Sequence, residues 1–279
     1  MSAAPERLLP RIFCCKDIFM REPILCFGHS HMVALRAGHL WRVRHGEAAA
    51  DDMEFVPLND PPCQLRTVLV EGRRELAPDL VEHVSTLLAG CRPKAVVLLV
   101  TGNEHNILGL FRHPDTPAPP DVDWPESGLP LAEGRDRVPA DLLFAEMQNQ
   151  LDRANFRFCR WIAGQVDCPL VIVGPPPPIV DEAHIRAHPG VFADRMDKLE
   201  IAPADFRHKL WRIDARLRQD LAAELGAAFV PAPAAAITDL GLAERLRGND
   251  PTHGNQEYGR MLLADVLAAL AAARTEESA

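Results

Sequence analysis

The sequence predicts a three-layer α/β/α domain with a parallel central sheet of about five strands. Short apolar segments and longer helical segments alternate along the chain about five times, and this order is typical of a parallel sheet with helices on both faces. Residues 95–100 form a continuous run of Ala, Val and Leu, as expected for a strand buried on both faces. Of the 279 residues, 47% are hydrophobic and 25% are charged, which is enough apolar material for one sizeable core.

The first half of the chain supplies three extended segments and two helices before residues 95–100. The apolar run 24–27 ends at Gly28 and predicts a buried strand, and residues 31–45 follow as a helix. Residues 54–58 and 67–70 are extended candidates, separated by the breaker Asp60-Pro61-Pro62. Apolar residues at helical spacing predict a helix over 76–88, and Gly90 follows where a C-terminal cap is expected.

The second half continues the alternation after one insertion. Residues 112–140 are rich in Pro, Asp and Gly without periodicity, so we expect a long surface loop, a candidate lid. The remaining predicted elements are a helix at 140–166, strands at 169–173 and 227–230, and helices at 203–225 and 256–272. The charges between 181 and 220 are interpreted as a solvated helix face. We expect an irregular leader at 1–22, a single domain at 23–273 and a flexible tail at 274–279.

Charge and cysteine content narrow the class of protein. The formal net charge is −9 and no block of Lys or Arg stands alone, which disfavours nucleic acid as a partner. The seven cysteines form no C-x-x-C motif, so we expect free thiols in a reducing compartment. The N-terminus lacks an apolar signal-peptide core, and no window reaches the length of a membrane span. The expectation is a cytoplasmic protein without a membrane partner, and its oligomeric state stays open.

Reactive and polar residues follow the predicted strands at the edge where parallel sheets bind ligands. Ser30 lies in the turn from the first strand into a helix, Asn103 follows the strand at 95–100, and Asp250 and His253 precede the closing helix. A serine hydroxyl needs a neutral imidazole to accept its proton, and the imidazole needs a partner that fixes its tautomer. An amide side chain such as that of Asn103 is a neutral donor for an oxyanion.

Three short blocks carry a resemblance to a known family: Gly28-His29-Ser30, Gly102-Asn103-Glu104 and Asp250-Pro251-Thr252-His253. In this order and these positions they resemble the SGNH (GDSL-like) hydrolases, over roughly residues 23–273. The resemblance implies a flavodoxin-like sheet, with Ser30 as nucleophile, His253 as general base and Asp250 as its orienting carboxylate. It also implies an oxyanion hole formed by the Ser30 backbone N–H, the Asn103 side chain and one glycine N–H.

The sequence departs from the family pattern in three places. His29 stands where an acidic residue usually precedes the nucleophile, and Gly102 and Asn103 are adjacent where many members have a residue between them. The oxyanion glycine is the third departure. Gly72 is its candidate if residues 67–70 form the second strand of the sheet, whereas the glycine is absent if that strand is 54–58.

The predicted reaction is ester hydrolysis through an acyl-enzyme, which requires no metal and no organic cofactor. The substrate is expected to be a small-molecule or carbohydrate ester, and we favour a small O-acyl group because the rim is polar and rich in histidine. His29 and His105 are the candidate substrate-binding residues. Purely structural roles also remain open, since Ser30 can cap a helix and Asn103 and Asp250 can stabilise turns.

Three other functions stay open. The histidines and Asp250 could converge on a metal in a phosphoesterase, because Gly102-Asn103-Glu104-His105 is similar to a box of the metallophosphoesterases. The fold could serve as a non-catalytic carbohydrate-binding protein. The same Ser–His pair could transfer an acyl group to an alcohol instead of to water.

Overall fold

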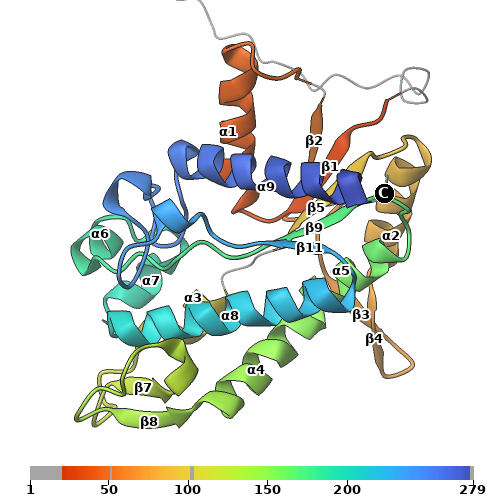
Figure 1. Cartoon of the computed structure of the whole chain (residues 1–279). Helices are drawn as coiled ribbons and strands as arrows, with labels where there is room; N and C mark the ends of the chain where they lie inside the picture. The colour runs from red at the N-terminus through yellow and green to blue at the C-terminus, as the bar shows by residue number, and fades with distance from the viewer. Residues whose placement is uncertain (1–20, 51, 101–103, 277–279) are drawn as a thin grey trace, which may run out of the picture.

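The central sheet has five parallel strands in the order β11-β9-β5-β1-β2 (Figure 1). The structure is a computed structural model that describes residues 21–50, 52–100 and 104–276, with side chains described to residue 273. The strands of this sheet are β1 (Ile24–Gly28), β2 (Met53–Pro57), β5 (Ala95–Leu99), β9 (Leu170–Val173) and β11 (Ala228–Val230). The predicted parallel sheet of about five strands is therefore confirmed.

The strand order fixes where ligands are expected to bind. Taken in chain order, the five strands lie as second, first, third, fourth, fifth, which is the flavodoxin-like arrangement. The direction of winding reverses between β1 and β5, and open parallel sheets bind ligands in the crevice at this point. Ser30 follows β1 directly and therefore lies at this switch point.

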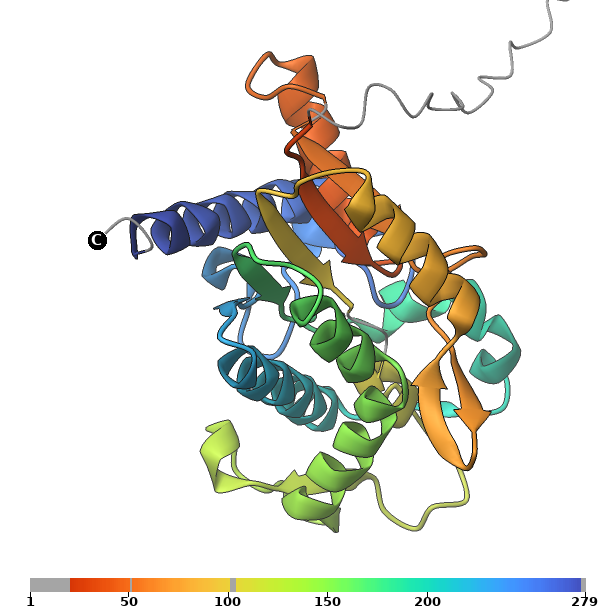
Figure 2. The same ribbon diagram turned by 90° about the vertical axis from the view of Figure 1, so that its right-hand side faces the viewer.

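Two layers of helices cover the sheet (Figures 1 and 2). One face carries α1 and α9, and the other carries α2, α4, α5 and α8. The long helices are α1 (Met32–Arg44), α2 (Pro78–Ala89), α4 (Ala140–Arg153), α5 (Asn155–Ala163), α8 (Ala204–Glu224) and α9 (Gln256–Glu276). The shorter ones are α3 (Glu104–Gly109), α6 (Glu182–Ala187), α7 (Ala193–Met196) and the 3-10 turns η2 (Pro125–Ser127), η3 (Gly190–Phe192), η4 (Ala234–Ala236) and η5 (Glu244–Leu246).

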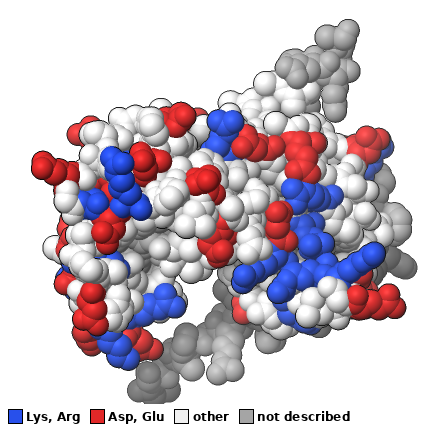
Figure 3. Space-filling view, turned by 90° about the horizontal axis from the view of Figure 1, so that it is seen from below, with Lys and Arg blue, Asp and Glu red and all other residues white. Residues whose placement is uncertain are grey.

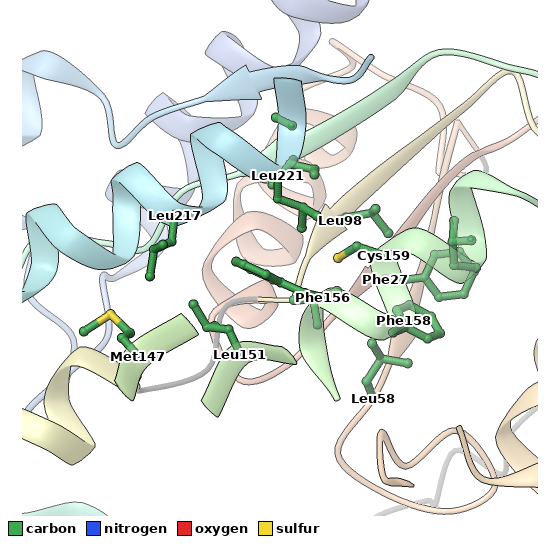
Figure 4. Packing of buried hydrophobic residues seen from close by; sticks show 14 of the residues in the cluster. Phe27, Leu58, Leu98, Met147, Leu151, Phe156, Phe158, Cys159, Leu217 and Leu221 are labelled. Carbon is green, nitrogen blue, oxygen red and sulfur yellow. The ribbon is translucent and has the colours of Figure 1, made fainter. Parts of the chain in front are cut away.

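Alternation along the strands divides the core into two clusters, one on each face of the sheet. Phe27 and Leu98 pack toward α5 and α8, whereas Cys26 and Val97 pack toward α1 and α9, because successive side chains of a strand point to opposite faces. In the first cluster the rings of Phe27 and Phe158 meet edge to face, with centroids 5.6 Å apart (Figure 4). This cluster anchors the end of β1 from which Ser30 projects.

Helices α1 and α9 approach each other closely enough that glycine is needed at their crossing. A Cβ on Gly259 would lie 1.8 Å from the carbonyl oxygen of Ala34, and a Cβ on Gly38 would lie 2.7 Å from the Gly259 carbonyl carbon. The contact brings the helix that begins just after Ser30 against the helix that begins just after His253. Packing of these two helices therefore sets the distance between the segment that carries Ser30 and the segment that carries His253.

Two predicted elements differ from the observed ones. Residues 67–70 do not join the central sheet; β3 (Thr67–Val70) pairs with β4 (Arg73–Leu76) as an antiparallel hairpin that projects away from it (Figures 1 and 2). The second strand of the sheet is β2, the alternative at 54–58. The helix predicted at 140–166 is broken at Ala154, whose φ of −141° and ψ of −51° lie outside the helical region.

The insertion at 112–140 has secondary structure of its own. Strands β7 (Pro120–Asp123) and β8 (Asp136–Pro139) pair in parallel, while β6 (Phe111–Arg112) pairs with β10 (Glu200–Ile201). The ammonium of Lys209 on α8 reaches into the insertion and donates to the Asp121 carboxylate at 2.8 Å and to the carbonyls of Val122 and Pro130. Both charged side chains are fully buried, so this segment is fastened to α8 and the interpretation as a lid is not supported.

Residues 1–20 of the predicted leader lie outside the described residues, and α9 continues to Glu276, beyond the predicted start of the tail at 274. None of the helices in the described part has the length and hydrophobicity that a membrane crossing requires. On the face seen from below, acidic and basic side chains are interspersed, with one group of Lys and Arg on its right-hand side (Figure 3).

Candidate active site

Ser30 lies in a tight turn between β1 and α1. The backbone N–H of Met32 donates to the His29 carbonyl and that of Val33 donates to the Ser30 carbonyl, so the chain turns into the helix immediately after Ser30. Gly28 is required at the start of this turn, because a Cβ there would lie 2.9 Å from the Leu99 carbonyl oxygen. The result is a half-buried serine at the carboxyl edge of the sheet, next to the N-terminal end of a helix.

His253 meets Ser30 from the loop that precedes α9. Its Nε2 lies 2.7 Å from the Ser30 Oγ, although the two residues are 223 positions apart in the chain. Backbone pairing closes this loop: the Gly248 N–H donates to the His253 carbonyl at 2.7 Å, and Arg247 and Gly254 form an isolated antiparallel β-bridge. The predicted meeting of the two side chains is thus present in the structure.

Asp250 holds the other side of the imidazole. Its Oδ1 lies 2.8 Å from the Nδ1 of His253, and the same oxygen accepts the backbone N–H groups of Thr252 at 2.8 Å and His253 at 2.9 Å. With a proton on Nδ1, the Nε2 is left as an acceptor facing Ser30. The arrangement is a serine, an imidazole and a carboxylate joined in one hydrogen-bonded line.

The electrostatics of Asp250 favour its ionised form. Partial burial by itself raises the pKa of the carboxyl, but the hydrogen bonds from the His253 ring and from the Thr252 backbone outweigh it, so the pKa lies well below its usual range. Asp250 is therefore a carboxylate whenever the imidazole it orients is neutral.

His31 supports the imidazole from a second direction. Its ring is buried and lies against the ring of His253, with centroids 4.4 Å apart and planes tilted by 44°. The Thr252 hydroxyl lies 3.1 Å from the Nδ1 of His253. The ring of His253 is thus fixed by contacts on its face as well as at both nitrogens.

His29 projects toward β2 and forms a polar rim with two asparagines that the sequence analysis did not identify. Its Nδ1 lies 3.1 Å from the Asn59 Oδ1, and the nearby Asn155 side chain acts to raise its pKa. Burial lowers the pKa of His29 despite these contacts, which favours a neutral ring that donates to Asn59. Asn59 lies just beyond the end of β2 and is exposed. The correct choice of second strand would have identified it.

Two predicted site residues are not at the site. Gly72 lies in the exposed turn of the β3–β4 hairpin with φ of 79°, outside the central sheet, so its assignment to the oxyanion hole is wrong. His105 is only 2% exposed and donates from Nδ1 to the Asp214 carboxylate at 2.9 Å; it points into the interior and does not face a substrate. Asn103 lies outside the described residues, so its predicted role stays a prediction.

Behind the site lies a buried ionic cluster. The interpretation of the charges between 181 and 220 as a solvated helix face holds for exposed residues such as Arg212 and Arg216 but is wrong for Asp214 and Arg218, which are buried. Arg218 on α8 contacts the carboxylates of Asp214 at 2.7 Å and Glu104 at 3.2 Å and donates to the Val100 carbonyl at 2.6 Å. Burial raises the pKa of Glu104; it acts the same way on Asp214, but Arg218 and the bond from His105 outweigh it and lower the pKa of Asp214. The cluster reaches the polar rim because Asn155 donates to Glu104 at 2.5 Å.

The segment after β9 borders the triad. A Cβ on Gly190 would lie 3.5 Å from the Cδ of Pro251 and 3.6 Å from the Cβ of Asp250, and Arg247 contacts Asp181 at 2.9 Å.

Among the described residues, no three His, Cys, Asp or Glu side chains are grouped as metal ligands would be.

No protein-family model matches the sequence, and no curated protein is significantly similar to it. Several solved structures are similar over most of their length. The periplasmic domain of a lipopolysaccharide acetyltransferase from Salmonella ser. Paratyphi A is 12% identical, with 89% of this chain and 83% of that chain covered and a TM-score of 0.47. A GDSL-like lipase from Bacteroides thetaiotaomicron is 11% identical over 90% and 89% of the two chains, with a TM-score of 0.43. The aryl esterase of M. smegmatis is 13% identical over 90% and 99%, with a TM-score of 0.45. At identities this low, the likeness concerns the fold alone.

Proposed function

We propose that this chain is a serine-dependent ester hydrolase of the SGNH type, which removes small acyl groups from a carbohydrate or another polar alcohol. The observation that carries the proposal is the hydrogen-bonded line Ser30–His253–Asp250, with contacts of 2.7 Å and 2.8 Å. A capping or turn-forming role for these residues would not require a serine and a histidine from distant parts of the chain to meet at hydrogen-bond distance.

The proposed reaction has two halves. The Nε2 of His253 accepts the proton of Ser30 as Oγ bonds to the ester carbonyl carbon, and the imidazolium then gives that proton to the leaving alkoxide. In the second half His253 takes a proton from water, the hydroxide attacks the acyl-enzyme, and the proton returns to Ser30 as the carboxylic acid leaves. Asp250 stays ionised throughout and stabilises the imidazolium.

The developing oxyanion needs donors close to Ser30. The backbone N–H of Ser30 lies at the N-terminal end of α1, where partial positive charge accumulates. Asn103 is the predicted side-chain donor. The polar rim is suited to hydrogen-bond the hydroxyl groups of a polar alcohol through its two accessible members, His29 and Asn59, which supports a carbohydrate or similar substrate.

Labelling with a fluorophosphonate, which reacts only with an activated serine, tests the proposal. We expect labelling of the wild type, and rates at least about a thousandfold lower in Ser30→Ala and His253→Ala. Ser85→Ala is the matched control, because Ser85 is an exposed serine on α2, and it should label as the wild type does. Full-rate labelling of Ser30→Ala would end the assignment.

The same samples separate the alternatives. A metal-dependent phosphoesterase predicts activity that a chelator removes and that Ser30→Ala keeps. A non-catalytic binding protein predicts a folded wild type that the probe does not label. An acyltransferase predicts labelling of Ser30 together with faster acyl transfer to an added alcohol than to water.

A further inference from the structure

A groove opens directly beside the nucleophile. One wall consists of Ser30 and of three residues of α1, Val33, Ala34 and Ala37; the other wall is the loop that carries Asp250 and His253, at residues 248–250 and 253–256. Counted from Ser30, the residues of the first wall follow the spacing i, i+3, i+4 and i+7, so they form one continuous stripe. We call this feature the α1 groove. Its volume of about 330 Å³ lies in the range of small-ligand pockets.

Most of the surface exposed inside the α1 groove is apolar, although Asn249, Asp250 and Asn255 also line the loop wall. Val33 lies one turn of helix beyond Ser30 and is 67% exposed, whereas Ala34 and Ala37 have side chains too small to fill the space beside it. The opposite wall includes Gly254, where a Cβ would lie 2.4 Å from the Tyr258 ring, and Gly248, where a Cβ would lie 3.0 Å from the His253 carbonyl oxygen. Glycine is therefore required at two positions of the loop wall, and the small Ala34 and Ala37 leave the space beside them open.

The surroundings of Ser30 are thus asymmetric. On the β2 side lies the polar rim of His29, Asn59 and Asn155, and on the α1 side lies the apolar groove. Apolar groups gain free energy by leaving water, whereas hydroxyl groups require hydrogen-bond partners. We propose that the α1 groove binds the acyl chain of the ester and leaves the polar rim to the alcohol; this rests on the proposed hydrolase function.

The dimensions of the groove limit the acyl chain. From Ser30 to Ala37 the helix rises through about two turns, roughly 10 Å, which accommodates an acyl chain of about six carbons. The chemical class assigned is therefore an ester of a short to medium-length, unbranched fatty acid. Acetyl groups would leave most of the groove empty, and long-chain groups would extend past Ala37 into water.

A series of 4-nitrophenyl esters from acetate to dodecanoate tests this, because the leaving group is the same throughout. We expect kcat/KM to rise about fourfold for each buried methylene up to about hexanoate and then to level off or fall. In Val33→Asp, a charge on the rim of the groove should lower the hexanoate-to-acetate ratio of kcat/KM by at least about tenfold. Leu40→Asp is the control: Leu40 is also an exposed apolar residue of α1, at 39%, but does not line the groove, and its ratio should equal that of the wild type.

A second variant acts on the far end of the groove. Ala37→Phe places a ring there and should lower kcat/KM for hexanoate by at least about tenfold relative to butyrate, because the longer chain loses its binding space. Thermal unfolding checks that each variant is folded. If Val33→Asp is not folded, the chain-length profile of Ala37→Phe alone tests the proposal. The proposal would be overturned if the folded variants had the same dependence of kcat/KM on acyl-chain length as the wild type. It would also be overturned if, in a series of acetate esters of different alcohols, the variants changed how kcat/KM depends on the size of the alcohol, because the groove would then bind the alcohol. Labelling of Ser30 with a small fluorophosphonate in the same variants shows that the triad works, so failure of the groove proposal is distinguished from failure of the proposed function.

Discussion

At the scale of single residues, the lowered pKa of Asp250 keeps its carboxylate ionised across the pH range in which the site is expected to work. Its pKa lies below the usual value of about 3.9, because bonds from His253 and Thr252 outweigh the effect of burial. A carboxyl whose pKa is lowered in the folded protein stays ionised as pH falls, until its own lowered pKa is reached. Loss of the Asp250 charge therefore cannot reduce activity between neutral pH and about pH 4.

The acid limb of the pH–rate profile should consequently report the histidine base. We expect kcat/KM to rise with pH as an imidazole becomes neutral and able to accept the Ser30 proton. Measurement with one ester from about pH 3 to about pH 9 checks this. A flat profile over that range would contradict a histidine base, and a limb confined to below about pH 4 would point to the carboxylate instead.

The three triad candidates could be predicted from the sequence because each lies in a short block at the end of a predicted element. His105 could not be placed, because its partner Asp214 is more than a hundred positions away on α8. Gly72 was misassigned through the choice of second strand: residues 67–70 are as apolar as a core strand, yet Leu69 is 68% exposed. Asn59 was missed through the same choice.

At the scale of elements, periodicity predicted where helices exist but not where one helix breaks into two. The first glycine or proline after Pro139 is Gly164, which caps the end of α5, yet the helix already ends at Arg153 and resumes at Asn155. The Asn155 side chain donates to Glu104, and this tertiary contact lies at the break in the helix. Such a contact is absent from the local pattern, so the break could not be predicted from it.

The crossing of α1 and α9 gives a prediction for one glycine. Gly259→Ala would improve helix propensity by about 1 kcal/mol at an unconstrained site, but here the new Cβ would lie 1.8 Å from the Ala34 carbonyl oxygen. We expect the clash to prevail and the free energy of unfolding to fall by about 3 kcal/mol, measured by urea denaturation. Gly164→Ala is the control, since its Cβ would find its nearest atom at an ordinary 3.5 Å. A Gly259→Ala variant as stable as this control would show that the two helices can move apart freely.

At the scale of the whole molecule, strand order brings the site together and buried charges hold the parts around it. The fold class followed from alternation alone, but the interior ion pairs did not, because the 203–225 region has the composition of an exposed helix. Lys209, Asp214 and Arg218 are all buried, and each is paired with a group far away in the chain or with a neighbour on α8. Pairing of this kind is decided by tertiary structure, which a local pattern does not contain.

The pair formed by Lys209 and Asp121 should determine whether the insertion at 112–140 stays folded onto α8. Lys209→Met would leave the Asp121 carboxylate buried without its cation, although two backbone N–H groups would still donate to it. Breaking a buried pair in this way costs about 3 kcal/mol, so we expect lower resistance to urea and new cleavage between residues 112 and 140 in limited proteolysis. Lys198→Met removes an exposed lysine and should change neither measurement. Because replacing both partners removes the unpaired charge, Lys209→Met combined with Asp121→Asn should recover part of the lost stability. If Lys209→Met alone is as stable and as protease-resistant as the wild type, the insertion is held by other contacts.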